Sequence, residues 1–483
     1  MQSIGNKIFI VIILAAFLTS GADIGQLLDQ AMQSHPAIEA QRAAAKQAFE
    51  QYREILEFLD PTLYAAGGYG SQLRGLPLVP AGYSRVGAED SLEAQAGVLV
   101  PIAQGAYLAA GGVTRRWFHP NDYRDPFYQH LLGVNLQIPL WRDRGFALLG
   151  FRERVALAGY WAVMERLHAT AQEVQHAIEQ AYVTACSSRN AYQITQGATK
   201  RFERLNTEAR ELADLKTIPE YQYTETVRDL QNGREDEEIA RNAWVIAQVA
   251  LAAAVGVDEP ISELDMTYEE FLKAVADATL PDFSFTAEDA LETRGEPRAL
   301  RSEREQAQAQ YEQTLEEHRD QVALNVGVNW QDDSRRGPFS ASYKSSPHHW
   351  GGEVMVSWTR PLDYTGTNAR TAQYQARLRQ LDSLLEGQRI AIAAELRTAQ
   401  LRLETARTRL QIVNAGVEAA QQTVAAEQER FRLGEGNSHA VLEAQKNLTA
   451  TLLRQNAAAA EFLRAMSDYD FACGYPAEIE DEE

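Results

Sequence analysis

The sequence predicts an α+β fold in which long paired helices carry a few amphipathic β-strands. Three features of the 483 residues predict it: a strand-like alternation in "QVALNVGVNWQ" at 321–331, an unbroken heptad repeat near the C-terminus, and an order of elements that occurs twice. With 45% apolar and 23% charged residues, the composition is that of a folded chain rather than a disordered one.

The N-terminus has the pattern of a secretory signal. Lys7 precedes the apolar run Ile8–Leu18, and small residues follow at Ser20 and Ala22. The run is too short for a membrane-spanning helix, which needs about 20 residues. We therefore expect a signal peptide at 1–22 and an exported mature chain; the alternative is a retained anchor. No later apolar run approaches about 18 residues, so no spanning helix is expected.

The charge balance and the cysteines narrow the class further. The chain has 46 Lys and Arg against 67 Asp and Glu, a formal net charge of −21. A nucleic-acid binder would carry a basic stripe, and the sequence has none, so nucleic acids and anionic membrane surfaces are not expected as partners. Cys186 and Cys473 lie far apart, which predicts two free, partly buried thiols rather than a disulfide framework.

The order helix, strands, long helix, turn and helix occurs twice, at an offset of about 220 residues. We place the first repeat at 23–256 and the second at 287–472, with an irregular linker and one short helix at 257–286 and an acidic tail at 473–483. The helices are expected from 23 to 59, from Phe146 to about Leu212 and on to Val255, from Ala287 to about Asp320, and from about Asn368 to Leu433 and on to Phe471.

The last long helix has its own period of seven. The first apolar position of each heptad is Leu396, Leu403, Leu410, Val417, Val424 and Phe431, and the second is Ile392, Ala399, Ala406, Val413 and Ala420. Such a repeat predicts a coiled-coil seam. Roughly 65 residues would make a helix of about 100 Å, which needs other long helices as partners.

Four amphipathic strands are expected. The one in the opening stretch has an apolar face (Val322, Leu324, Val326, Val328 and Trp330); the polar positions of the strands include Asn325, Asn329, Asn135, Gln137 and Ser357. Each strand is long enough to cross a bilayer when tilted, and Trp330, Trp350 and Trp358 lie near strand ends, as in an aromatic girdle. Four strands cannot close a barrel, but several chains can share one. We expect the apolar face to contact lipid; the alternative is a soluble sandwich on a helical stalk.

Three segments resemble the TolC-like outer-membrane efflux protein family. They are "LLDQAMQSHPAIEAQRAAAKQA" (Leu27–Ala48), with a bend at His35-Pro36, "LQIPLWRDRGFALLGFRERVALA", and "ERFRLGEGNSHAVLEAQKNLTAT" (Glu429–Thr451) at a hairpin tip. The resemblance implies a homotrimer with a twelve-stranded outer-membrane barrel, four strands per protomer, above a twelve-helix periplasmic tunnel. A periplasmic adaptor and an inner-membrane pump would be its partners, and no cofactor is implied.

The same resemblance implies a gate and an adaptor contact at the helix tips. By position, Glu443 matches an acidic aperture residue, Ala440 a second place that is acidic in the family pattern, and Gly436 a place that can hold Arg. The adaptor-contact candidates at the tips are Leu433, Gly434, Asn437, Ser438, Thr217, Ile218 and Pro219. Each also has a structural explanation: Gly434 as a helix C-cap, Asn437 or Ser438 as an N-cap, Pro219 as a helix start, and Glu443 as a solvated charge.

One segment departs from the four-strand pattern. Residues 91–117 resemble an extra strand pair before the main second strand, which would either lengthen the barrel hairpin or fold near its rim.

The sequence offers no catalytic or metal-binding pattern. It has no Ser-His-Asp order, phosphate-binding Gly loop or HExxH motif, and His348-His349 are expected as loop histidines. The predicted function is a passive exit duct of a tripartite efflux or type I secretion system, in the outer membrane with a large periplasmic portion. The alternative is a soluble periplasmic coiled-coil scaffold or adaptor; a hydrolase on a helical stalk would need a nucleophile with a base in reach.

Overall fold

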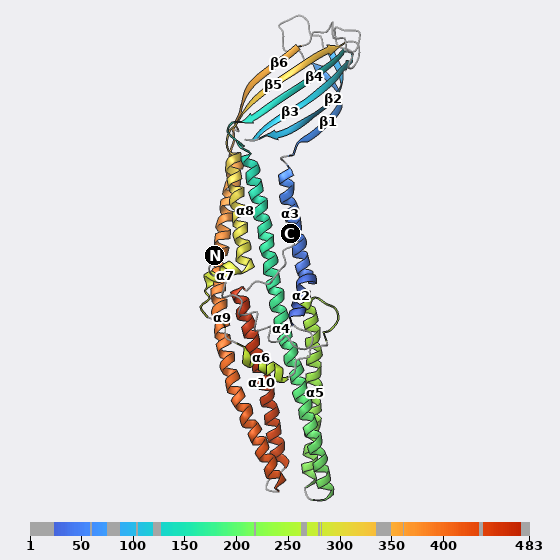
Figure 1. The fold of residues 1–483 in the computed structure, drawn as a ribbon, viewed down its shortest axis with the longest axis vertical. Coiled ribbons are helices and arrows are strands. Elements are labelled where there is room, and N and C mark those ends of the chain that lie inside the picture. The colour runs from blue at the N-terminus through green and yellow to red at the C-terminus, as the bar shows by residue number, and fades with distance from the viewer. Residues whose placement is uncertain are drawn as a thin grey trace. The chain divides into compact units, whose positions relative to one another are not determined.

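The computed structural model describes residues 24–57, 60–74, 87–102, 105–118, 127–216, 219–261, 268–278, 281, 283–334, 349–360, 362–433 and 438–474. The predicted signal peptide and His348 lie outside these residues. The chain divides into two compact units, and Figure 1 labels the helices and strands that they contain. Unit 1 comprises 1–46, 161–301 and 383–483, and unit 2 comprises 47–160 and 302–382.

The helices follow the predicted order closely. They are α2 (Ile24–Ser34), α3 (Pro36–Leu56), α4 (Ala147–Asp214), α5 (Glu220–Val255), α6 (Tyr268–Asp277), α7 (Ala287–Thr293), α8 (Gly295–Glu317), α9 (Thr365–Arg432) and α10 (Ser438–Cys473). The expected bend at His35-Pro36 is confirmed, because α2 ends before His35 and α3 begins at Pro36. Proline lacks the N–H that a continuous helix would need and disfavours helical geometry in the residue before it.

The two helical hairpins have matching lengths. Helices α4 and α9 each contain 68 residues, and α5 and α10 each contain 36. The start of α4 is separated from that of α9 by the same number of residues as the start of α5 from that of α10.

Unit 1 is held together by the faces along which its helices meet. In α9 the predicted heptad positions Leu396, Leu403, Leu410, Val417 and Val424 are buried. Tyr192 of α4 stacks on Trp244 of α5 with ring centroids 5.6 Å apart. Asn456 of α10 donates to the backbone oxygen of Ser187 in α4 at 2.8 Å. The seam predicted from the period of seven is therefore the buried face of α9.

The cysteines are unpaired, as predicted, but they are fully rather than partly buried. Cys186 and Cys473 are both free and buried. Burial raises the pKa of each thiol to about 12, so neither is a reactive thiolate at neutral pH.

By length and composition alone, α5 is the one helix in the described part of the chain that could cross a bilayer. The sequence-based expectation overlooked it because the charged run Arg234–Glu238 interrupts the helix, whereas 246–255 is apolar apart from Gln248. Leu251 and Val255 lie in the buried core of unit 1. We therefore describe α5 as one rod of a helical hairpin.

Unit 2 contains a six-stranded antiparallel sheet, which corrects the expectation of four strands. The strands are β1 (Thr62–Arg74), β2 (Gly87–Ile102), β3 (Ala106–Phe118), β4 (Phe127–Pro139), β5 (Gln321–Ser334) and β6 (His349–Thr359), in the order β1-β2-β3-β4-β5-β6. The extra pair expected at 91–117 is β2 and β3. It lies within the sheet, between β1 and β4, and not at its rim.

Candidate functional site

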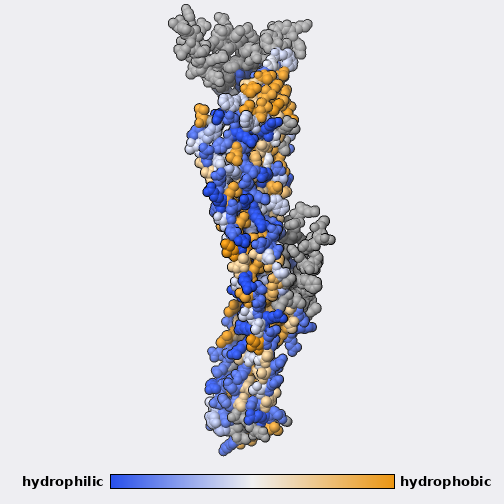
Figure 2. Space-filling model, turned by 90° about the vertical axis from the view of Figure 1, so that its left-hand side faces the viewer, coloured by the Kyte–Doolittle hydropathy of each residue, from blue (hydrophilic) through white to orange (hydrophobic). Residues whose placement is uncertain are grey.

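The outer face of the sheet carries the alternation seen in the opening stretch. In register with Val328 of β5 lie Val134 of β4 and Ala110 of β3, and Val98 of β2 continues that row. On β6 the side chains of Val354, Val356 and Trp358 are 74%, 65% and 63% exposed. On the side of the molecule that faces the viewer in Figure 2, apolar side chains gather over strands of unit 2. An exposed apolar sheet of this size needs a cover.

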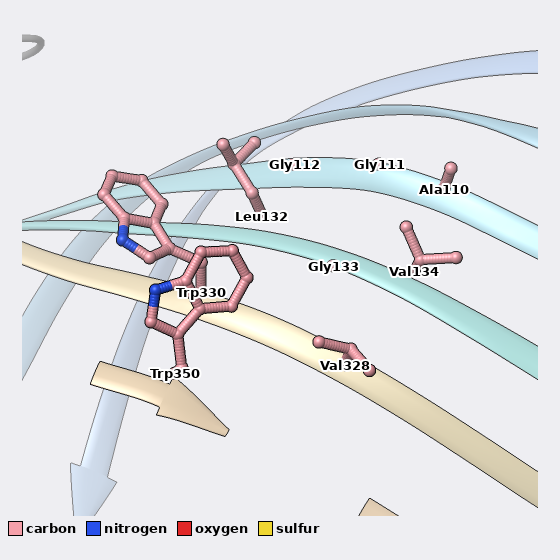
Figure 3. Close-up of a pocket in the computed structure, with 9 residues that line it drawn as sticks. All are labelled: Ala110, Gly111, Gly112, Leu132, Gly133, Val134, Val328, Trp330 and Trp350. Atoms are coloured by element: carbon pink, nitrogen blue, oxygen red, sulfur yellow. The ribbon is translucent and has the colours of Figure 1, made fainter. Parts of the chain in front are cut away.

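Part of this face forms a shallow recess of about 910 Å³ (Figure 3). Its residues are Ala110, Gly111, Gly112, Leu132, Gly133, Val134, Val328, Trp330 and Trp350. Trp330 and Trp350 are register partners at one end of it. Leu132 of β4 and Gly112 of β3 lie in register with Trp330. Two residues further along each strand, on the same face, lie His130 of β4 and Thr114 of β3, with His130 Nδ1 3.1 Å from Thr114 Oγ1. The apolar band therefore ends at the tryptophan pair.

The opposite face carries the polar positions that the sequence predicted. Asn135, Gln137, Asn325, Asn329 and Ser357 all lie on it by register. The strand pair that the four-strand scheme left out also contributes here, because Arg115 of β3 and Glu93 of β2 form a 2.7 Å ion pair. A sheet with one apolar and one wet face separates lipid from water when it is closed into a ring.

At one end of unit 1 the first turns of α10 lie beside the first turns of α5. Near the start of α10, His439 Nδ1 lies 3.9 Å from Glu225 Oε2 of α5. One to two turns further, Lys446 Nζ lies 3.0 Å from Asp229 Oδ2. The side chain of Asp229 is 1% exposed and that of Lys446 is 37% exposed. Sequence reasoning missed this pair, because each residue taken alone reads as a charge on a polar helix face.

The predicted gate and adaptor-contact residues belong to this end as far as they are described. Glu443 is exposed on α10, Ala440 is half-buried, and Leu433 is exposed just after α9. Pro219 is the N-cap of α5, and Ser438 begins α10. Gly436, Gly434, Asn437, Thr217 and Ile218 lie outside the described residues. These gate and contact roles remain predictions.

A serine, a histidine and acids do meet in unit 1, which the sequence did not reveal. His176 Nδ1 lies 3.0 Å from Ser467 Oγ, and His176 Nε2 lies 3.4 Å from Asp468 Oδ1. Ser467 is buried, and its hydroxyl donates to Glu179 Oε2 at 2.6 Å. Burial and then the charge of Glu179 raise the pKa of nearby Asp470 to about 8. A buried hydroxyl already bonded to a carboxylate cannot meet a substrate, so we interpret the cluster as helix-packing contacts.

Comparison with known proteins identifies the family of the second half of the chain. Residues 286–469 match the family model described as "Outer membrane efflux protein". The chain carries the outer membrane efflux protein domain. This confirms the resemblance and the outer-membrane location that the sequence predicted, and it favours the channel over the soluble scaffold. The matched range includes α7, α8, β5, β6, α9 and most of α10.

Solved structures extend the similarity to nearly the whole chain. The outer membrane channel CmeC of Campylobacter jejuni is 13% identical, with 96% of this chain and 88% of that chain covered and a TM-score of 0.66. The outer membrane protein VceC of Vibrio cholerae is 14% identical, with 94% and 97% covered and a TM-score of 0.66. The open state of the MtrE outer membrane channel of Neisseria gonorrhoeae is 16% identical, with 94% and 90% covered and a TM-score of 0.67. At these identities the likeness establishes the fold.

No curated protein matches the sequence.

Proposed function

We propose that this protein is the outer-membrane exit duct of a tripartite efflux or type I secretion system. The observation that carries the proposal is an open six-stranded sheet with one apolar and one polar face, on a chain that carries the efflux domain. The duct performs no chemistry of its own. An inner-membrane pump supplies the energy and a periplasmic adaptor connects the two.

The height of the apolar band supports insertion in a bilayer. Trp350 and Trp358 mark its two ends on β6. With about 3.4 Å per residue, the strand between them measures about 27 Å. A strand tilt of about 40° reduces this to about 21 Å of height, close to the apolar band of about 25 Å in outer-membrane barrels. A soluble scaffold would have no reason to expose a band of this height.

The sheet needs strands from further copies of the chain to close into a barrel. Its edge strands β1 and β6 each have one neighbour in the described sheet. In hydrocarbon every backbone polar group must be paired, so only a closed ring of strands survives there. The proposed ring is a homotrimer, as in TolC-like channels. The equal lengths of the two hairpins support the proposed two-repeat organisation, in which each copy gives the tunnel four rods.

The proposal is tested with the purified full-length protein in detergent and in planar bilayers. A duct forms oligomers and conducts ions after insertion. A monomeric protein that forms no pore and stays in the soluble fraction of the cell would contradict the duct and favour the scaffold.

For the narrow end we propose that the hairpin turns contact the adaptor and that Glu443 lines the aperture. Three Glu443 carboxylates, one from each copy, would repel each other and attract cations. Glu443→Gln is therefore expected to raise single-channel conductance or to lower the preference for cations. The matched control is Glu461→Gln on the same helix, because Glu461 is paired with Arg409. Unchanged currents in Glu443→Gln would make Glu443 a solvated charge only.

A further inference from the structure

We infer that β2 and β3 are membrane-spanning strands of the barrel wall, so that each copy contributes six strands and three copies close an eighteen-stranded barrel. This inference rests on the proposed function and deepens it. It concerns the width of the duct where it crosses the membrane.

The pairing of the strands places the hairpin in the wall. Thr62–Arg74 of β1 pairs with β2 along its whole length, and β3 pairs with β4 from Tyr107 to Trp117. A loop folded at the rim would leave β1 free to pair with β4. In the described sheet β1 pairs with β2 instead.

The β2–β3 hairpin has one apolar and one polar face, like the other strands of the sheet. On the apolar face, Ala96, Val98 and Val100 of β2 oppose Gly112, Ala110 and Leu108 of β3. On the polar face lies the ion pair of Glu93 with Arg115. Such a pair suits a water-filled lumen, because isolated charges would be costly in lipid.

The join between β2 and β3 is also packed tightly on the lumen side. A Cβ at Gly97 would collide with the ring of Tyr64 and with the backbone oxygen of Ala110. A Cβ at Gly111 would meet the Tyr64 hydroxyl oxygen at 2.9 Å. The Tyr64 side chain of β1 therefore lies across both glycines and covers the seam of the hairpin.

An even number of strands lets identical copies join without changing the pattern. All five pairings in the sheet are antiparallel, so β6 runs opposite to β1. The β6 edge of one copy can then pair with the β1 edge of the next as another antiparallel ladder. Repetition of this one contact closes a ring.

Strand number sets the diameter of a barrel. With strands about 4.8 Å apart and tilted by about 40°, twelve strands give a backbone diameter of about 24 Å and eighteen give about 36 Å. Equivalent backbone positions in a three-fold ring would then be about 21 Å or about 31 Å apart, respectively. The two barrels can be distinguished by one distance.

The experiment attaches a nitroxide spin label to Val354→Cys in the full-length protein and measures distances between copies by double electron–electron resonance. Val354 is strongly exposed on the outer face, so the label should not disturb packing. The native thiols are buried, which protects them from labelling. Val356→Cys is the second label site, and exposed Ala450→Cys on α10 is the control that detects assembly independently of the barrel.

We expect three copies and a Val354 label-to-label distance about 10 Å longer than in a twelve-stranded ring, because the outward-pointing label adds the same length to both radii. Three copies with the shorter distance would exclude β2 and β3 from the wall and overturn the inference, while the proposed duct would stand. Two copies would mean a twelve-stranded barrel of two chains and would also overturn it. If no distance between copies could be measured at any of the three sites, that result would contradict the proposed function itself.

Discussion

Val326→Arg is expected to destabilise the inserted protein by about 2–4 kcal/mol, the cost of an arginine on the lipid face near the middle of the bilayer. Val326 is the central residue on the apolar face of β5. On that face it lies between Leu324 and Val328, within the apolar band that ends at Trp330. Its register partners Leu136 and Val354 offer no counter-charge. The measurement is the shift of the unfolding transition in lipid vesicles.

The matched control is Asn325→Arg, one residue away. Asn325 faces the polar side of the sheet, and its amide lies 3.5 Å from the Ser357 hydroxyl oxygen. An arginine there would project into water and is expected to cost well under half as much as at Val326. Equal costs at the two neighbouring positions would mean that both faces see the same solvent, which would contradict the barrel.

The parts predicted well from the sequence are those with a local period. The seven-residue repeat of Leu396, Leu403 and Leu410 shows directly which side of α9 is buried. The two-residue repeat around Val326 and Val328 likewise shows which side of β5 is apolar. Both patterns depend on neighbours within one element, so no knowledge of the rest of the chain is needed.

The strand count could not be settled in the same way. The outer positions of β2 include Ala94 and Ala96, small residues that give a weak alternation, and Pro101 in the same strand lacks a ladder donor. Gly111 and Gly112 of β3 give no hydrophobic signal at all. The pairing of β2 with β1 and of β3 with β4 is what makes them strands, and pairing is not visible in a single segment.

The candidate site at the hairpin turns shows the same limit. The turns themselves were predicted from helix stop and start signals such as Pro219. The contact of Asp229 with Lys446 joins two helices that are far apart in the sequence, and either residue alone is an ordinary charge on a helix. Only the fold brings them together.

Lys446→Ala is expected to weaken this end of unit 1 by about 2–5 kcal/mol, because it leaves the buried Asp229 carboxylate without its partner on α10. The side chain of Asp229 is 1% exposed, so water cannot replace the ammonium group. Arg228 lies 3.1 Å from the other carboxylate oxygen but is 62% exposed and belongs to the same helix, so it cannot tie α5 to α10. The loss should appear as faster hydrogen exchange in the first turns of α10 and the neighbouring part of α5.

Two comparison variants separate the ion pair from general effects. Arg228→Ala removes an exposed partner and is expected to cost less than about 1 kcal/mol. Asp229→Asn combined with Lys446→Met removes both charges and should recover much of the stability lost in Lys446→Ala, because a neutral pair avoids the unpaired buried charge. If the double variant were as labile as Lys446→Ala, the loss would come from the packing of the lysine stem rather than from its charge. Because the pair joins α5 to α10 beside the turns, its rupture should also change the single-channel current if these turns form the narrow end of the duct.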